Sequence, residues 1–365
     1  MTILIIGYMH PKYDKRVYRT VKALSKENKV IYQYWTDKDE EEYIEENIKY
    51  LPIKYKKNIQ ASPIIKLKNR RKLDKKILKI IQAYDYDILY MHHFFASMPI
   101  EPFRIAKKRK KKIIYDIHEY HPENFLNNLS GIKKQIKEKI LWKIFKKQLK
   151  LSDKLIFVSK DIQEDIYNVL SINKSYYIQK NYAEISINSK KKLKEISFVG
   201  KINRNLDEEK IILKKLNQKG FSFRIIGMES DYFKDIPHEY TTFLPYDQMI
   251  KELSKSSFSL ISFNTIKNRS YKNDLFSLPN KYYDSIAAET PVIVKNTFIS
   301  MAKEVEKLKI GVVINPKNVD ESVGKILEAY NNYDELLNNI KKHKNKFIWD
   351  EEKEKEFINF VLSQG

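Results

Sequence analysis

The sequence of 365 residues contains no cysteine. Disulfide bonds and thiolate metal sites are therefore excluded, and this composition fits a reducing compartment. No apolar run approaches the roughly 18 residues that a membrane-spanning helix needs. The apolar residues 3–6 stop at Gly7 without a basic region before them, which is not the pattern of a signal peptide. From these absences we expect a cytoplasmic protein, either free or held peripherally at the inner face of a membrane.

Acidic residues are few relative to basic ones, with 47 Asp and Glu against 69 Lys and Arg. The resulting formal net charge of +22 attracts nucleic acid, anionic lipid or phosphorylated substrates. The same excess also follows from a composition that is rich in Lys, Ile, Asn and Tyr throughout, so both explanations stay open. A hydrophobic content of 42% supplies packed cores, and the length suits two α/β domains better than one.

Short apolar runs alternate with amphipathic helical stretches, which predicts βαβ units and parallel sheets. The predicted strands of the first half are 3–7, 29–35, 87–91, 112–117 and 154–158, with helices from Asp14 and over 97–110 and 132–151. After the polar stretch 181–194, the predicted strands are 195–199, 221–226, 258–262, 291–294 and 311–314, with helices from Asp207, Tyr246, Pro279, Ser300 and Val319. We therefore predict an α/β protein of two Rossmann-like domains, 1–187 and 188–346, whose parallel sheets face an interdomain cleft.

The segment from Leu278 to Pro291 carries the most chemical information. Pro279 suits the first turn of a helix, and the free amides of a helix N-terminus favour a bound anion. Asp284 follows about a turn and a half later, where a carboxylate can accept hydrogen bonds from vicinal hydroxyls. The spacing also fits an ordinary crossover helix with Tyr283 in the core, and by itself it favours that explanation.

This segment resembles the P-N-K-x-x-E-x-x-A-x-G-x-P-V-I signature of GT-B fold glycosyltransferases, in particular the retaining enzymes of family 4. Further resemblances follow in the same chain order and together cover nearly the whole chain. They are the first loop and helix over 7–24, the turn over 115–123, the stretch 152–159, the donor loops 198–202, 225–227 and 243–246, and a closing helix within 347–365 that crosses back to the first domain.

The resemblance implies a site for a nucleotide-sugar donor, with a UDP-sugar favoured over a GDP-sugar and no metal or other cofactor. Its donor-binding residues are Gly7, Gly200, Lys201, Arg204, Gly227, Asn280, Lys281 and Asp284. Asp284 is implied to bind the donor ribose. Lys201 and Arg204 are implied to neutralise the diphosphate, whose charge grows in the transition state. For these two cations, a solvated surface loop is the alternative explanation.

On the acceptor side, the resemblance implies roles for Asp14, Arg16, His118 and Glu119. His118 follows a predicted strand, at the edge where sheets of this kind bind ligands. It is implied to contact the transferred sugar or the acceptor, and together with Lys201 and Arg204 it forms the predicted catalytic set.

Histidines near this turn allow a second interpretation. Asp116, His118 and His121 are close enough in sequence to hold a metal, although the family resemblance implies none. His92 and His93 end another predicted strand, where a packed histidine is favoured over a ligand.

The predicted activity is that of a hexosyltransferase or N-acetylhexosaminyltransferase of EC 2.4 type, acting with retention in cell-surface polysaccharide biosynthesis. Its acceptor would be a glycan or a polyprenyl-linked glycan. Phe276 and Glu289 depart from the family, which has glutamate and glycine there, at the sugar end of the site. A nucleotide-sugar epimerase or hydrolase and a non-catalytic GT-B partner of a glycosylation complex stay open. Nucleic-acid binding ranks last because no recognisable motif supports it.

Residues 131–150 mix isoleucines and Trp142 with lysines, and the basic stretch 103–112 precedes them. A basic amphipathic helix of this kind can lie on anionic lipid. The two segments are therefore a candidate membrane surface. A crossover helix with a solvated lysine face is the alternative.

Overall fold

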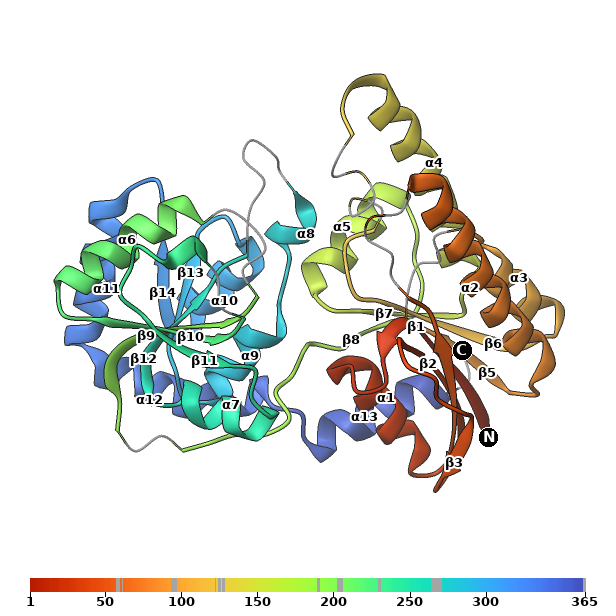
Figure 1. Cartoon of the computed structure of the whole chain (residues 1–365). Helices are drawn as coiled ribbons and strands as arrows, with labels where there is room; N and C mark the ends of the chain where they lie inside the picture. Colours follow the sequence, from red (N-terminus) through yellow and green to blue (C-terminus); the bar gives the residue numbers. More distant parts are fainter. Residues whose placement is uncertain are drawn as a thin grey trace. The chain divides into compact units, whose positions relative to one another are not determined.

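The computed structural model describes residues 1–56, 60, 62–92, 97–121, 123, 126, 129–188, 191–201, 206–228, 231–263 and 271–363. The chain divides into an N-terminal unit, Met1–Gln179 with Glu352–Gly365, and a C-terminal unit, Lys180–Glu351 (Figure 1). The division therefore falls earlier than the predicted 187/188, because Tyr182 lies in a core cluster of the second unit. Residues 347–351 also belong there, since Ala183 N donates to Phe347 O at 2.9 Å and Trp349 N to Ala183 O at 2.8 Å.

An eight-stranded sheet with the order β3-β4-β2-β1-β5-β6-β7-β8 forms the N-terminal unit. Its strands are β1 (Thr2–Pro11), β2 (Lys29–Thr36), β3 (Tyr43–Glu45), β4 (Ile48–Lys54), β5 (Ile88–Met91), β6 (Lys112–Ile117), β7 (Lys154–Phe157) and β8 (Tyr176–Ile178). All pairs are parallel except β3 with β4. The apolar run 3–6 is fully buried, as expected for a parallel strand covered on both faces.

Helices cover both faces of this sheet. They are α1 (Lys15–Ser25), α2 (Pro63–Ala83), α3 (Glu101–Lys108), α4 (Gly131–Leu151), α5 (Lys160–Leu170) and α13 (Glu351–Leu362). Figure 1 shows α1 and α13 on one face and α2 to α5 on the other. The predicted N-cap of α1 is confirmed, because the Asp14 side chain accepts from Val17 N at 3.2 Å. Two lysines of the sheet bind backbone oxygens in the last turn of α13. Lys112 Nζ donates to Val361 O at 2.8 Å, and Lys154 Nζ donates to Phe360 O at 2.6 Å.

The C-terminal unit is a six-stranded, wholly parallel sheet with the order β11-β10-β9-β12-β13-β14. Its strands are β9 (Leu193–Gly200), β10 (Ser222–Gly227), β11 (Glu239–Thr242), β12 (Ser256–Ile261), β13 (Val292–Lys295) and β14 (Gly311–Ile314). Its α-helices are α6 (Asp207–Gln218), α7 (Tyr246–Leu253), α8 (Lys272–Leu275), α9 (Asn280–Ala287), α10 (Ile299–Leu308), α11 (Val319–Asn331) and α12 (Tyr333–His343). The predicted α/β fold of two parallel-sheet domains is confirmed.

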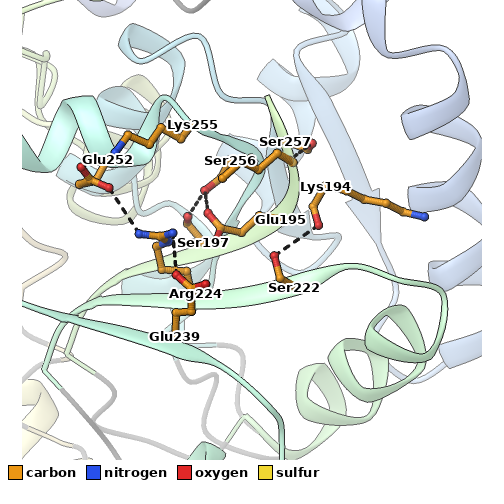
Figure 2. A network of polar contacts seen from close by, with 11 residues as sticks. Lys194, Glu195, Ser197, Ser222, Arg224, Glu239, Glu252, Lys255, Ser256 and Ser257 are labelled. Carbon is orange, nitrogen blue, oxygen red and sulfur yellow. Dashed lines mark hydrogen bonds and ion pairs between the residues drawn. The ribbon is translucent and has the colours of Figure 1, made fainter. Parts of the chain in front are cut away.

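A polar network joins the amino-terminal halves of these strands. Arg224 on β10 donates to Glu195 on β9 at 3.0 Å and to Glu239 on β11 at 2.7 Å (Figure 2). Ser256 on β12 donates to the other Glu195 oxygen at 2.6 Å, and Glu252 on α7 lies 3.4 Å from the guanidinium. These charged groups pair with one another at the amino edge of the sheet. A ligand is therefore expected at the opposite, carboxyl edge, where parallel sheets of this kind bind ligands. No helix within the described ranges has the length and apolarity that crossing a bilayer demands.

Candidate functional site

In the N-terminal unit, polar side chains gather where β5 and β6 end. Asp116 is the penultimate residue of β6, His118 follows that strand, and His92 follows β5. His92 Nδ1 lies 3.0 Å from His118 Nε2 and 3.4 Å from Asp116 Oδ2. Because β5 and β6 are adjacent and parallel, both chain segments end at the same edge of the sheet. His118 therefore lies at the carboxyl edge of the sheet, where the sequence predicted it.

A buried ion pair lies beneath this cluster. Arg16 on α1 donates through Nη2 to Asp116 Oδ1 at 2.6 Å and through Nη1 to the backbone oxygen of Gln179. Tyr90 OH donates to Asp116 Oδ2 at 3.0 Å. Burial alone would raise the pKa of Asp116, but the guanidinium of Arg16 holds that pKa well below its usual range. The guanidinium assigned to the acceptor is thus engaged within the unit, where it fixes a carboxylate.

The two histidines are neutral rings. Burial lowers the pKa of His92, and it lowers the pKa of His118 to about 3 despite the neighbouring carboxylate. Within the described residues, His92 Nε2 is buried without a hydrogen-bond partner, so a proton there would be an unsatisfied donor. We infer that His92 carries its proton on Nδ1 and donates to His118 Nε2. His118 then carries its own proton on Nδ1, as a donor for a hydroxyl.

A second carboxylate lies at the N-cap of α1, three residues after β1 ends. Asp14 accepts a 3.0 Å hydrogen bond from His10, whose ring centroid is 5.1 Å from that of His118. Burial opposes the shift, but the bond to His10 lowers the pKa of Asp14 below its usual range. Asp14 is therefore an ionised, partly exposed acceptor beside His118. His10 was not predicted, because the first strand was expected to end at residue 7, whereas β1 continues to Pro11.

Gly7 has a packing explanation inside this unit. It lies within β1, and a Cβ on it would stand 2.8 Å from the backbone oxygen of Gln33 on β2. Tyr8, which follows, has a positive φ of 55° and donates its hydroxyl to Asp74 at 2.7 Å. Close strand packing thus accounts for the glycine, while its contact with a donor stays a prediction. Glu119 is exposed at the turn after β6.

The alternative interpretation, a metal site of Asp116, His118 and His121, involves a different third residue in the structure. The His92, Asp116 and His118 ligand atoms lie within 4.8 Å of one another, whereas His121 packs its ring against Phe145. A divalent cation here would stand beside the Arg16 guanidinium, which already neutralises the single carboxylate. It would also replace the hydrogen bond between the two neutral rings. These residues therefore fit a neutral histidine pair better than a metal centre.

In the C-terminal unit, two glycines face each other at the carboxyl ends of β9 and β10. Gly227 pairs with Gly200, and their φ angles are +131° and +107°. A Cβ on Gly227 would meet Gly200 O at 2.8 Å, whereas a Cβ on Gly200 would meet nothing within 4 Å. The backbone of Gly200 is thus approachable. Lys201 follows it and is exposed, while Arg204 lies outside the described residues.

We expect Gly227→Ala to lower the free energy of unfolding by about 2 kcal/mol or more, from the positive φ and the contact with Gly200. The matched control is Gly324→Ala, in the middle of α11, where a Cβ meets nothing within 4 Å. There alanine should stabilise the protein by about 0.5–1 kcal/mol. Urea unfolding of both variants measures the difference. Equal effects of the two substitutions would contradict this account of Gly227.

Helix α9 carries the remaining donor residues. Asn280 is its exposed first residue, after Pro279 at the N-cap. Lys281 Nζ donates to Ser262 O at 2.6 Å and lies 4.3 Å from the ring centroid of Phe198. Burial, with a further contribution from Lys295, lowers the pKa of Lys281 to about 7. Lys281 thus holds α9 against the ends of β9 and β12. With a pKa of about 7 its side chain is partly the neutral amine, which an adjacent anion would cause to take up a proton.

Asp284 lies on the same helix and is almost fully buried. Its Oδ1 accepts from Tyr246 OH at 2.7 Å, and that hydroxyl accepts from Glu184 N at 3.1 Å. Burial and the neighbouring carboxylate raise the pKa of Tyr246, so the hydroxyl stays a donor. The carboxylate therefore has a fixed orientation. Tyr246 was predicted as a helix start and as the last residue of the donor loop 243–246, but nothing in the sequence indicated its bond to Asp284.

The departure at Glu289 has a structural explanation. Glu289 adopts a φ of +54°, the conformation that a glycine takes without strain. Its buried carboxylate is paired with Lys344 at 2.7 Å. The backbone conformation is thus kept by a residue that rarely adopts it. Phe276, the other departure, is the partly exposed C-cap residue of α8, beside the buried Asp274.

Comparisons with known proteins give the same architecture. Residues 15–176 match the family model "Glycosyltransferase Family 4". The chain is similar in fold to sucrose-phosphate synthase from Thermosynechococcus elongatus, with a TM-score of 0.71 at 9% identity over 98% of this chain and 97% of that one. It is similar to WaaG, a glycosyltransferase involved in lipopolysaccharide biosynthesis, with a TM-score of 0.69 at 8% identity over 99% and 100%. Anabaena HepE in complex with UDP gives a TM-score of 0.65 at 10% identity over 99% of each chain. No curated protein matches by sequence.

Proposed function

We propose that this chain, a glycosyltransferase of the GT-B fold with a family 4 domain over residues 15–176, moves a hexose or N-acetylhexosamine from a UDP-sugar to a glycan or lipid-linked glycan acceptor. The observation that carries the donor side is the carboxyl edge of the C-terminal sheet. There the approachable backbone of Gly200 and the oriented carboxylate of Asp284 belong to one unit. Anabaena HepE, a protein of the same fold, is described in complex with UDP.

In this proposal, Asp284 accepts hydrogen bonds from the donor ribose. Lys201, Arg204 and the free amides of α9, which begins at Asn280, neutralise the diphosphate. Charge on the diphosphate grows as the sugar leaves, so these groups stabilise the transition state more than the bound donor. The chemistry then needs no metal.

The acceptor side is proposed from the N-terminal unit. His118 donates from Nδ1 to a hydroxyl of the transferred sugar or the acceptor, and Asp14 and Glu119 accept from acceptor hydroxyls. Transfer with retention by front-face attack, in which the leaving phosphate takes the acceptor proton, requires no protein nucleophile. A role in cell-surface polysaccharide synthesis is supported by the description of WaaG as a glycosyltransferase involved in lipopolysaccharide biosynthesis. Acceptors at the inner membrane face are a further part of this proposal.

A donor screen tests this function. We expect UDP and one UDP-sugar to raise the melting temperature, with about 2.7 kcal/mol of stabilisation at a hundredfold excess over the Kd. GDP and inorganic phosphate at the same ionic strength are the controls. Release of UDP only when a glycan acceptor is added would support transfer. Conversion of the donor without acceptor would assign an epimerase or hydrolase instead, and binding without turnover a non-catalytic partner. No stabilisation by any nucleoside diphosphate would contradict the proposal.

A further inference from the structure

The first turns of α4 project from the N-terminal unit. The buried residues of this helix are Phe145, Gln148 and Leu149, all in its second half. In the first half, Ile132, Ile136 and Ile140 expose 74%, 56% and 53% of their surface. Their spacing of four places them on one helix face. Figure 1 shows this end of α4 standing clear of the remainder of its unit.

Helix α2 begins in the same way. Its buried apolar residues Leu73, Ile77 and Ile81 lie beyond the first two turns, whereas Ile64 and Leu67 expose 80% and 59% of their surface. Such exposed isoleucine and leucine side chains at a helix start contribute nothing to the core of the unit. Large apolar groups that a fold leaves in water indicate a surface that something else covers.

Both projecting ends lie at one edge of the sheet. A helix that connects two parallel strands runs antiparallel to them, so its N-terminus lies at the carboxyl edge. Helix α4 connects β6 to β7, and α2 precedes β5. Helix α3 packs against both of them on the same face of the sheet. The two helix starts therefore share the carboxyl edge with His118 and Asp116.

Each apolar start is surrounded by cations. The first ten residues of α2 contain Lys66, Lys68, Arg70, Arg71 and Lys72 and no acid. The first ten residues of α4 contain Lys133, Lys134, Lys137 and Lys139 and one acid, Glu138. In an anionic bilayer the lysine and arginine head groups would meet the phosphate layer, and the neighbouring apolar side chains would meet the acyl layer. A second copy of a chain with a net charge of +22 would instead meet repulsion at this surface.

The basic stretch 103–112 does not belong to this surface. Three of its cations are paired within the unit: Lys107 with Asp153, Arg109 with the backbone oxygen of Ile81, and Lys111 with Asp85. The stretch also runs along α3 to Lys112, the start of β6, so its cations from Lys107 onward lie toward the amino edge of the sheet. The predicted membrane surface of 103–112 with 131–150 therefore divides between opposite edges, and the start of α2 takes the place of 103–112.

We propose that the starts of α2 (63–72) and α4 (131–140) form one docking surface, the α2–α4 surface, for a bilayer rich in anionic phospholipid. The isoleucines and leucine enter the acyl boundary while the lysines and arginines bind lipid phosphates. The surface and the acceptor residues share one edge of the unit. A lipid-linked acceptor would therefore reach His118 from the membrane to which the unit is docked. That last step rests on the proposed function, whereas lipid binding does not.

Sedimentation of the full chain with vesicles of phosphatidylcholine, with and without phosphatidylglycerol, tests the surface. We expect about a hundredfold preference for the anionic vesicles, lost as salt rises. The variants Ile132→Ser/Ile136→Ser/Ile140→Ser and Ile64→Ser/Leu67→Ser should each weaken binding about tenfold. The control Val169→Ser removes a side chain that is 50% exposed near the end of α5, at the amino edge, and should bind as the parent does.

Three results would overturn the proposal. They are equal binding of both vesicle types, undiminished binding of the two variants combined, and a dimer of the parent that the same substitutions dissociate. UDP stabilisation of each variant is measured in parallel, and we expect it to be unchanged because the substituted residues are exposed. Loss of lipid binding with retained UDP binding separates this surface from the donor site.

Discussion

Replacing Arg16 with methionine is expected to lower the free energy of unfolding of the N-terminal unit by about 3–5 kcal/mol at neutral pH. Methionine retains the length of the side chain but leaves Asp116 as a buried carboxylate without its cation. Its remaining neighbours, Tyr90, His92 and His118, are neutral. Urea unfolding followed by tryptophan fluorescence, with the parent measured beside it, gives the difference.

The pH dependence of this loss has a definite sign. In the parent, the folded pKa of Asp116 is depressed, so its contribution is complete above the unfolded pKa, near 3.9, and is lost as pH falls toward the folded value. In the variant, burial without Arg16 raises the pKa, so protonation relieves the cost as pH falls. The difference between the two proteins should therefore shrink between pH 7 and pH 4.

An exposed ion pair with the same separation is the control. Arg104 lies 2.6 Å from Glu101 on the surface of α3, and Arg16 lies 2.6 Å from Asp116 in the interior. Arg104→Met should change stability by about 0.5 kcal/mol or less, because solvent and salt screen the pair. A similar loss in both variants, or a loss for Arg16→Met that grows on acidification, would refute the buried-pair account.

The ion pair also shows what the sequence can and cannot indicate. Arg16 and Asp116 are a hundred residues apart in the sequence. Arg16 was predicted as an acceptor residue and Asp116 as a possible metal ligand, and neither prediction paired one with the other. The predicted strands locate the ends of β5 and β6, but their adjacency depends on a strand order that periodicity does not encode. For this reason His121 was considered as a partner of His118, and His92 was assigned to packing.

Helix α2 was missed for a related reason. Its exposed Ile64 and Leu67 interrupt the single apolar stripe by which an amphipathic helix is recognised. The strands of the C-terminal unit were easier, because their apolar runs are short, continuous and buried; 311–314 was predicted with the bounds that β14 has. Exposed apolar side chains therefore make secondary structure harder to predict from the sequence, whereas buried apolar runs make it easier.

Asp284→Asn is expected to weaken UDP binding about tenfold to a hundredfold, measured by titration calorimetry at constant salt. The carboxylate accepts hydrogen bonds from ribose hydroxyls in the proposed site, and a hydrogen bond to a charged group contributes about 1.5–3 kcal/mol. Asparagine retains the shape of the side chain but replaces one acceptor oxygen with a donor. Its amide can still accept from Tyr246 through the remaining oxygen, so the helix should keep its place.

Two further variants separate the ribose contact from other effects. Asp247→Asn, at an exposed position next to Tyr246 on α7, makes the same change in net charge and should leave UDP affinity within about twofold of the parent. Tyr246→Phe removes the hydrogen bond that orients Asp284 but keeps the carboxylate, so we expect a smaller loss, of about fivefold. If Asp284→Asn binds UDP as tightly as Asp247→Asn does, the carboxylate does not contact the ribose. If Tyr246→Phe loses as much affinity as Asp284→Asn, the orientation of the carboxylate, rather than its charge, is what the nucleotide requires.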